Sequence, residues 1–154
     1  MRKINKSLYG ILILILGVAA AAMIFLPALI YRDSNASFTG LQAIFGTEFA
    51  DLGIFGSGVL EPNILGMVAF ALPLIAGLIA VLFEKGAIVS LLLFIAGGVL
   101  LFTLPTYQVA SVTILGNRTV LDVTWTLGYG VVIAACASAG GALVSLLKLV
   151  SRPE

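Results

Sequence analysis

Residues 8–30 of the chain read LYGILILILGVAAAAMIFLPALI. This stretch contains no Asp, Glu, Lys or Arg, and about 20 mostly apolar residues are enough for a helix to cross roughly 30 Å of hydrocarbon. The stretch therefore predicts a transmembrane helix. The alternative is a cleaved signal peptide, since Arg2, Lys3 and Lys6 precede it. Signal-peptide cores are about 7–15 residues long, and this apolar run is longer.

Three further stretches have the same character, and none contains a charged residue: residues 64–83, 87–104 and 126–147. Inside lipid each backbone polar group must be paired within its own segment or in a closed barrel, so continuous apolar runs of this length predict helices. We therefore expect an all-α membrane protein: one membrane domain over residues 1–154, built as a four-transmembrane-helix bundle. Residues 31–63 and 105–125 are the expected outer segments, with a short helix in the first and a β-hairpin in the second.

The overall composition supports a membrane protein and excludes several functions. Hydrophobic residues make up 61% of the chain, charged residues 10%, and the mean hydropathy is +1.20. Soluble domains contain about 25% charged residues. The net charge of +1 does not favour nucleic-acid binding. The chain has no histidine, one cysteine (Cys136) and no Asp, Glu, Lys or Arg in the expected spans. We therefore expect no enzyme activity, no cofactor and no metal site.

The distribution of basic residues predicts the orientation. Of the eight Lys and Arg residues, six flank one side of the expected spans: Arg2, Lys3, Lys6, Lys85, Lys148 and Arg152. Arg32 and Arg118 lie on the other side. Because the cytoplasmic flanks of membrane helices carry the excess of Lys and Arg, both termini are expected in the cytoplasm of a plasma-membrane protein.

The first outer segment has a clear helix signal. Thr39 and Gln42 stand at the spacing of a capping box, and Gly46 suits a helix C-terminal stop. This predicts a short helix near residues 39–45. Phe38, Leu41 and Phe45 recur at helical spacing, so they are expected to form an apolar face. That face either binds a partner or packs on the protein's own helices.

The second outer segment has the pattern of a β-hairpin. Residues 107–115 and 118–125 are rich in β-branched and aromatic side chains and flank Gly116-Asn117. Leu121, Val123 and Trp125 alternate with more polar positions and should share one face. The hairpin either covers the helices or offers its free edge to a strand of a partner. With Phe38, Leu41 and Phe45, these three residues form the predicted outer partner surface.

A stripe of small residues runs along the last expected helix at four-residue spacing: Gly130, Ala134, Ser138 and Ala142. Small residues let helices approach closely in lipid. The stripe either packs against the protein's own helices or joins copies or partners.

The run Phe38-Thr-Gly-Leu-Gln-Ala-Ile-Phe-Gly46, directly outside a first span, resembles a pattern in uncharacterised four-span membrane proteins of low-GC Gram-positive bacteria. That resemblance implies a plasma-membrane location and no particular activity. The layout of long and short outer segments is also similar to that of claudins. Claudins carry Gly-Leu-Trp and a cysteine pair in the first outer segment. This chain has Gln42 after Gly40-Leu41 and no cysteine there, so a barrier function is not carried over.

These observations predict a non-enzymatic scaffold or accessory subunit in a lipid bilayer, which binds a membrane-protein partner or a second copy through its fourth helix and outer segments. The alternative is a component of an oligomeric transporter or channel.

Overall fold

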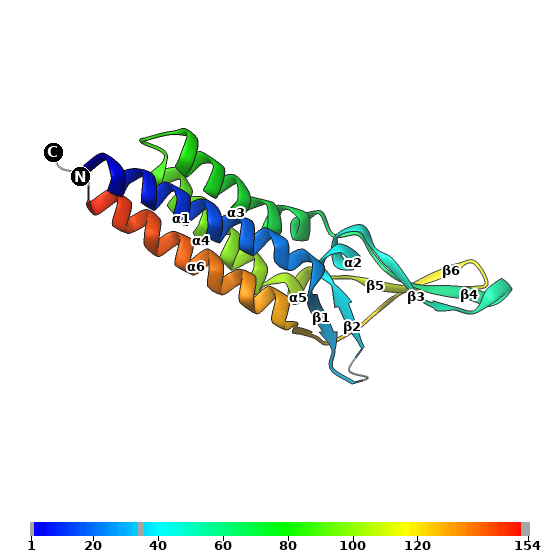
Figure 1. The fold of residues 1–154 in the computed structure, drawn as a ribbon. Helices are drawn as coiled ribbons and strands as arrows, with labels where there is room; N and C mark the ends of the chain where they lie inside the picture. The colour runs from blue at the N-terminus through cyan, green and yellow to red at the C-terminus, as the bar shows by residue number, and fades with distance from the viewer. Residues whose placement is uncertain (1, 34–35, 152–154) are drawn as a thin grey trace.

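The computed structural model describes residues 2–33 and 36–151, without the side chains of residues 2–6. Arg152, and the side chains of Arg2, Lys3 and Lys6 used in the charge count, lie outside this description. Four helices lie side by side, and two β-sheets extend from one end of them (Figure 1). The helices are α1 (Arg2–Ala22), α3 (Ile64–Leu82), α4 (Ala87–Phe102) and α6 (Tyr129–Val150). The start of α1 and the end of α6 lie together at the end opposite the sheets.

The predicted fold class is wrong, because the protein is a mixed α/β structure rather than an all-α four-helix bundle. Within residues 2–33 and 36–151, seven strands form two antiparallel sheets of three and four strands outside the helices. The number of spans is corrected as well. In the part of the chain that the structure describes, three helical segments are long and apolar enough to cross a membrane: Ser7–Phe25, Ile64–Leu82 and Tyr129–Val150. Helix α4 has 16 residues, or about 24 Å at 1.5 Å per residue, which is shorter than a typical span.

The first apolar run divides into a helix and a strand. Helix α1 ends at Ala22, a 3-10 turn covers Met23–Phe25, and Pro27–Tyr31 forms β1. Proline cannot donate to a continuing helix and clashes with its preceding turn, so Pro27 limits the helix. The expected span of residues 8–30 was therefore too long at its outer end.

The smaller sheet has the order β2-β1-β7, with β2 at Ser37–Thr39 and β7 at Trp125–Leu127. The larger sheet has the order β3-β4-β5-β6. Its strands are β3 (Thr47–Asp51), β4 (Gly56–Leu60), β5 (Ala110–Ile114) and β6 (Asn117–Leu121). Strands β1 and β7, and strands β4 and β5, come from the two different outer segments. The two segments therefore form one structure instead of two independent loops.

The short helix predicted near residues 39–45 is confirmed as α2 (Gly40–Phe45). The Thr39 hydroxyl accepts from the Gln42 amide, the Gln42 side chain accepts from the Thr39 amide, and Gly46 ends the helix with φ 81°. The apolar face differs from the expected one. Ala43 and Ile44 are buried, whereas Phe45 is 64% exposed. The helix is too short to carry the i+4 pattern onward, because the chain enters β3 directly after Gly46.

The predicted hairpin is confirmed as β5–β6, with a shifted turn. Ile114 pairs with Asn117, so Leu115 and Gly116 form the two-residue turn, with φ 51° and 83°. Strand β6 ends at Leu121, and a separate strand, β7, follows it. Trp125 therefore belongs to the smaller sheet and does not share a sheet face with Leu121. A further 3-10 turn (Gly53–Phe55) joins β3 to β4, and α5 (Leu104–Tyr107) follows α4.

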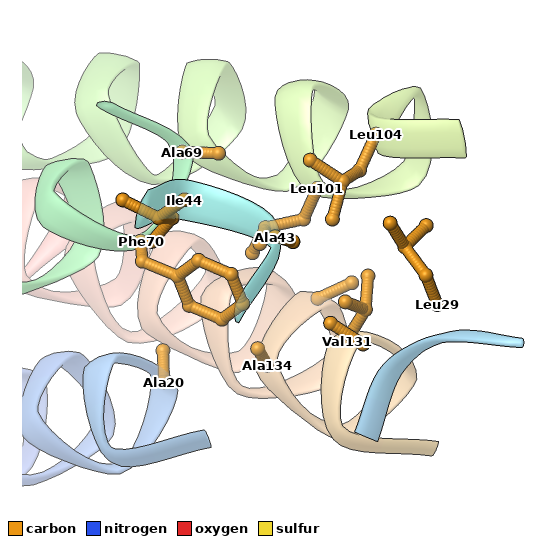
Figure 2. Close-up of a cluster of buried hydrophobic side chains, with 12 residues drawn as sticks. Ala20, Leu29, Ala43, Ile44, Ala69, Phe70, Leu101, Leu104, Val131 and Ala134 are labelled. Carbon is orange, nitrogen blue, oxygen red and sulfur yellow. The ribbon is translucent and has the colours of Figure 1, made fainter. Parts of the chain in front are cut away.

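The main core lies where the helices meet the smaller sheet (Figure 2). Phe70 of α3 occupies the centre, with Ala20 of α1 and Ala134 of α6 close to it in the cluster. Leu29 of β1 and Ile44 of α2 contribute from the outer side. This core fixes the smaller sheet onto the ends of the helices.

Candidate functional site

The small-residue stripe of α6 lies against the protein's own chain. Gly130, Ala134 and Ser138 are buried, and the Ser138 hydroxyl donates to the Ala134 carbonyl at 2.9 Å. A Cβ atom at Gly130 would lie 2.7 Å from Cβ of Leu26, so only glycine fits there. Ala142 is half-buried against the second core cluster, which includes Phe94. This face of α6 is already occupied within one molecule, and a partner surface must be sought elsewhere.

Four aromatic rings gather where the two sheets meet. The ring centroid of Trp125 lies 5.6 Å from that of Phe38 and 6.0 Å from that of Tyr31, and Phe38 lies 6.3 Å from Phe49. Edge and tilted contacts at these distances are favourable for aromatic pairs. Phe38 and Trp125, both predicted for the outer partner surface, are thus brought together as a structural cluster.

The remaining residues of that predicted surface are not assembled into one patch. Leu41 and Val123 are half-buried, whereas Phe45 and Leu121 are exposed. Phe45 ends α2, and Leu121 ends β6. The six residues therefore divide between an internal cluster and separate exposed positions.

A buried polar junction, which the sequence did not predict, joins the two outer segments. Asn63 caps α3 by accepting from the Gly66 amide at 3.1 Å, and its side-chain amide donates to the Gln108 oxygen at 3.1 Å. Gln108 in turn donates to the Glu61 carbonyl at 2.9 Å, and Glu61 forms an ion pair with Arg118 of β6. Asparagine directly before an apolar helix is a recognisable N-cap signal, but its contact with a residue 45 positions away has no local signature.

We expect Asn63→Ala to lower the free energy of unfolding by about 2–3 kcal/mol. Loss of an N-cap costs about 1 kcal/mol, and the buried side-chain oxygen of Gln108, left without a donor, adds about 1–2 kcal/mol. Asn63→Asp keeps the capping oxygen and loses only the donor to Gln108, so its effect should be smaller. Thermal unfolding of both variants in detergent measures the difference. Equal effects of the two variants would mean that the cap on the Gly66 amide contributes nothing, and an Asn63→Asp protein as stable as wild type would mean the same for the bond to Gln108.

Strands β3 and β6 are the two edges of the larger sheet, and all five residues of β6 are exposed. The N–H and C=O groups of successive β6 residues point alternately toward β5 and away from it. Residues that flank a two-residue turn form a hydrogen-bonded pair, and such pairs alternate along an antiparallel ladder. Asn117, Thr119 and Leu121 therefore point their backbone groups toward β5, whereas those of Arg118 and Val120 point outward. The bond from the Leu115 amide to the Phe55 carbonyl fits this alternation on the other side of β5.

Residues 2–33 and 36–151 contain no group of three or more Cys, Asp and Glu side chains that could hold a metal ion. Burial raises the pKa of Tyr107, a hydrogen bond with Thr103 lowers it to a smaller extent, and the hydroxyl donates to the Leu100 carbonyl. This tyrosine is fixed in a structural bond at the outer end of α4.

Comparison with protein-family models, curated proteins and solved structures gave no significant match for this chain.

Proposed function

We propose that the protein is a non-enzymatic accessory subunit or scaffold of the plasma membrane, and that it binds an extended segment of a membrane-protein partner along the free edge of β6. The observation that carries the proposal is this exposed edge strand, in a sheet that projects from one end of helices suited to a bilayer.

The outward faces of the helices support placement in lipid. Large apolar side chains stand exposed along α1, α3, α4 and α6, among them Ile15, Leu78, Leu92 and Leu143. A continuous apolar surface on several adjacent helices would be unfavourable in water, and it is the expected surface of helices in a bilayer.

The arrangement of basic residues supports cytoplasmic termini. Lys85 and Lys148 lie at the end of the helices where α1 begins and α6 ends. Lys148 is buried there and donates to the carbonyl of Ala80 at 2.7 Å. Three further basic positions of the sequence, 2, 3 and 6, lie at the start of α1, whereas Arg32 and Arg118 lie beside the sheets. Since cytoplasmic flanks carry the excess of Lys and Arg, both termini are placed in the cytoplasm and both sheets on the outer side, which requires the shorter α4 to cross the bilayer beside α3.

The edge of β6 has the properties of a strand-addition site. Main-chain groups of Arg118 and Val120 point outward, and a partner strand paired there would extend the larger sheet to five strands. Natural edge strands are usually protected by proline, bulges or covering elements, and β6 contains no proline. An accessory role follows because the site binds a partner without any chemical step.

Val120→Pro provides the test. Proline removes the outward N–H of residue 120 and blocks the approach of a strand, while the bonds from Thr119 and Leu121 to β5 remain. We expect recovery of the partner by affinity purification in mild detergent to fall about tenfold, because at least one backbone hydrogen bond and the close fit are lost. Quantitative mass spectrometry of the purified complexes measures this.

Val120→Ala is the matched control, since it removes most of the side chain and keeps the N–H group. It should retain the partner. A protein population that is identical for wild type, Val120→Pro and Val120→Ala would overturn the role of the β6 edge. Thr119→Pro removes the N–H group that faces β5 and should therefore destabilise the larger sheet. That outcome would support the assigned directions of the β6 backbone groups.

A further inference from the structure

Two turns of the larger sheet meet at the end of the molecule farthest from the start of α1 (Figure 1). One joins β3 to β4, and the other joins β5 to β6. The Leu115 amide donates to the Phe55 carbonyl at 2.9 Å, so the turns form one unit. This unit carries five exposed apolar side chains, which we call the apolar tip: Leu52, Ile54, Phe55, Ile114 and Leu115.

The apolar tip is unusually exposed for side chains of this kind. Ile54 is 91% exposed, Leu115 74% and Phe55 61%, and the other two are about half exposed. The neighbouring acid, Asp51, accepts a hydrogen bond from the Gly53 amide at 2.8 Å and so helps to shape the turn. Exposed apolar side chains gathered on two hydrogen-bonded turns at a protruding end mark a contact site.

The backbone at Leu115 strengthens this interpretation. Its φ of 51° lies in the left-handed region, where glycine, asparagine and aspartate are the favoured residues of such a turn. Leucine there is less stable than asparagine, and its side chain gains no burial in return. A strained residue with an exposed apolar side chain is expected where the side chain serves a contact outside the molecule.

The small area of the apolar tip and its position far from α1 favour contact with lipid over contact with a protein. Even at roughly 200 Å² for each fully exposed large side chain, five partly exposed ones offer less than the ~800 Å² per partner of a stable protein interface. Shallow insertion into lipid needs only apolar side chains and no matching shape. The tip also lies at the end of the molecule opposite the start of α1, away from the bilayer in which the helices are proposed to lie.

We propose that the apolar tip inserts into the surface of a second lipid bilayer, opposite the one that holds the helices. The proposal rests on the membrane placement of the helices given above, but not on partner binding at β6. It makes the protein a tether between two membranes, with the larger sheet as the spacer.

The test uses the full chain in nanodiscs, mixed with protein-free vesicles of phosphatidylcholine, either alone or with 30% phosphatidylglycerol. Wild-type nanodiscs should float with both kinds of vesicle, whereas empty nanodiscs should not. Ile54→Asp should lower the bound fraction at least about tenfold, because burial of one large apolar side chain corresponds to a factor of that order. Phe45→Asp, an exposed site outside the tip, is the control and should float like wild type.

Leu115→Asn separates binding from folding. Asparagine relieves the backbone strain and removes the apolar side chain, so this variant should unfold at a higher temperature and bind vesicles more weakly.

Three results would each overturn the proposal: wild type that fails to float, flotation unchanged by Ile54→Asp, or pairing of nanodiscs through protein alone. Val120→Pro should leave flotation unchanged, and Ile54→Asp should leave recovery of the β6 partner unchanged. The two proposals therefore fail independently.

Discussion

Gly17→Ala is expected to lower the free energy of unfolding by about 2–3 kcal/mol, whereas Gly10→Ala leaves it nearly unchanged. Both glycines lie on the face of α1 that packs on α3. A Cβ atom at Gly17 would stand 2.4 Å from the carbonyl oxygen of Pro73 and 3.2 Å from its carbon. These are backbone atoms, which cannot turn aside as a side chain can. The two helices must separate, and overpacking of this kind costs about 1–3 kcal/mol.

Gly10 provides the matched control two helical turns away. Its added Cβ would lie 3.4 Å from the Ala80 carbonyl oxygen and 3.8 Å from Cα of Val81, which is ordinary contact. Alanine also favours the helix by up to about 1 kcal/mol over glycine. Thermal unfolding in the same detergent compares the variants. Similar unfolding temperatures for Gly10→Ala and Gly17→Ala would show that α1 and α3 do not approach as closely as described.

The helices could be predicted from sequence because their signal is local. Long uncharged runs identify α3 and α6 to within a few residues, since an apolar run of about 20 residues has few other stable forms. The same reasoning failed at Leu26–Ile30. Apolar residues in a strand covered by other protein look the same in sequence as apolar residues in lipid. Only the position of Pro27 indicated that the helix ends.

The outer sheets were missed because their pairing is not local. Strand β4 pairs with β5 across about 50 residues, and no pattern in either strand indicates its partner. Strand β4 also contains Gly56 and Gly58, which have low intrinsic preference for strands. Phe49 of β3 happens to lie at helical spacing from Phe45, so the two suggested one face of a helix instead of a turn into a strand.

In the candidate site, too, features with a local sequence signal could be predicted and features that depend on non-local pairing could not. The hairpin and its free edge could be predicted, since β-branched residues flanking a turn form a local signal. The apolar tip could not, because Ile54 and Leu115 come from separate segments that meet only through the larger sheet. The stripe Gly130–Ala142 was recognised from its spacing, but spacing alone does not distinguish packing within one molecule from packing between molecules.

Gly56→Ala is expected to disrupt the larger sheet, at a cost of roughly 3 kcal/mol or more. Gly56 begins β4 with φ 150° and ψ −173°, a conformation that is almost restricted to glycine. An added Cβ would lie 1.8 Å from the Thr113 carbonyl oxygen and 2.9 Å from its carbon, both in β5. Backbone strain and the clash add, so β4 cannot keep its register with β5. Hydrogen exchange should then show lost protection in β4 and β5, with the helices still protected.

Gly53→Ala separates the two contributions, because Gly53 has a positive φ of 61° and open space around its Cβ position. It should cost only the strain of a left-handed residue, about 1–2 kcal/mol, and should leave β4 and β5 protected. If Gly56→Ala behaved like Gly53→Ala, the close approach of β4 to β5 would be wrong.

Because β5 connects β4 to β6, loss of the pairing between β4 and β5 should also release the β6 edge and separate the two halves of the apolar tip. Gly56→Ala should therefore abolish partner recovery and vesicle flotation together, unlike the single-site variants Val120→Pro and Ile54→Asp.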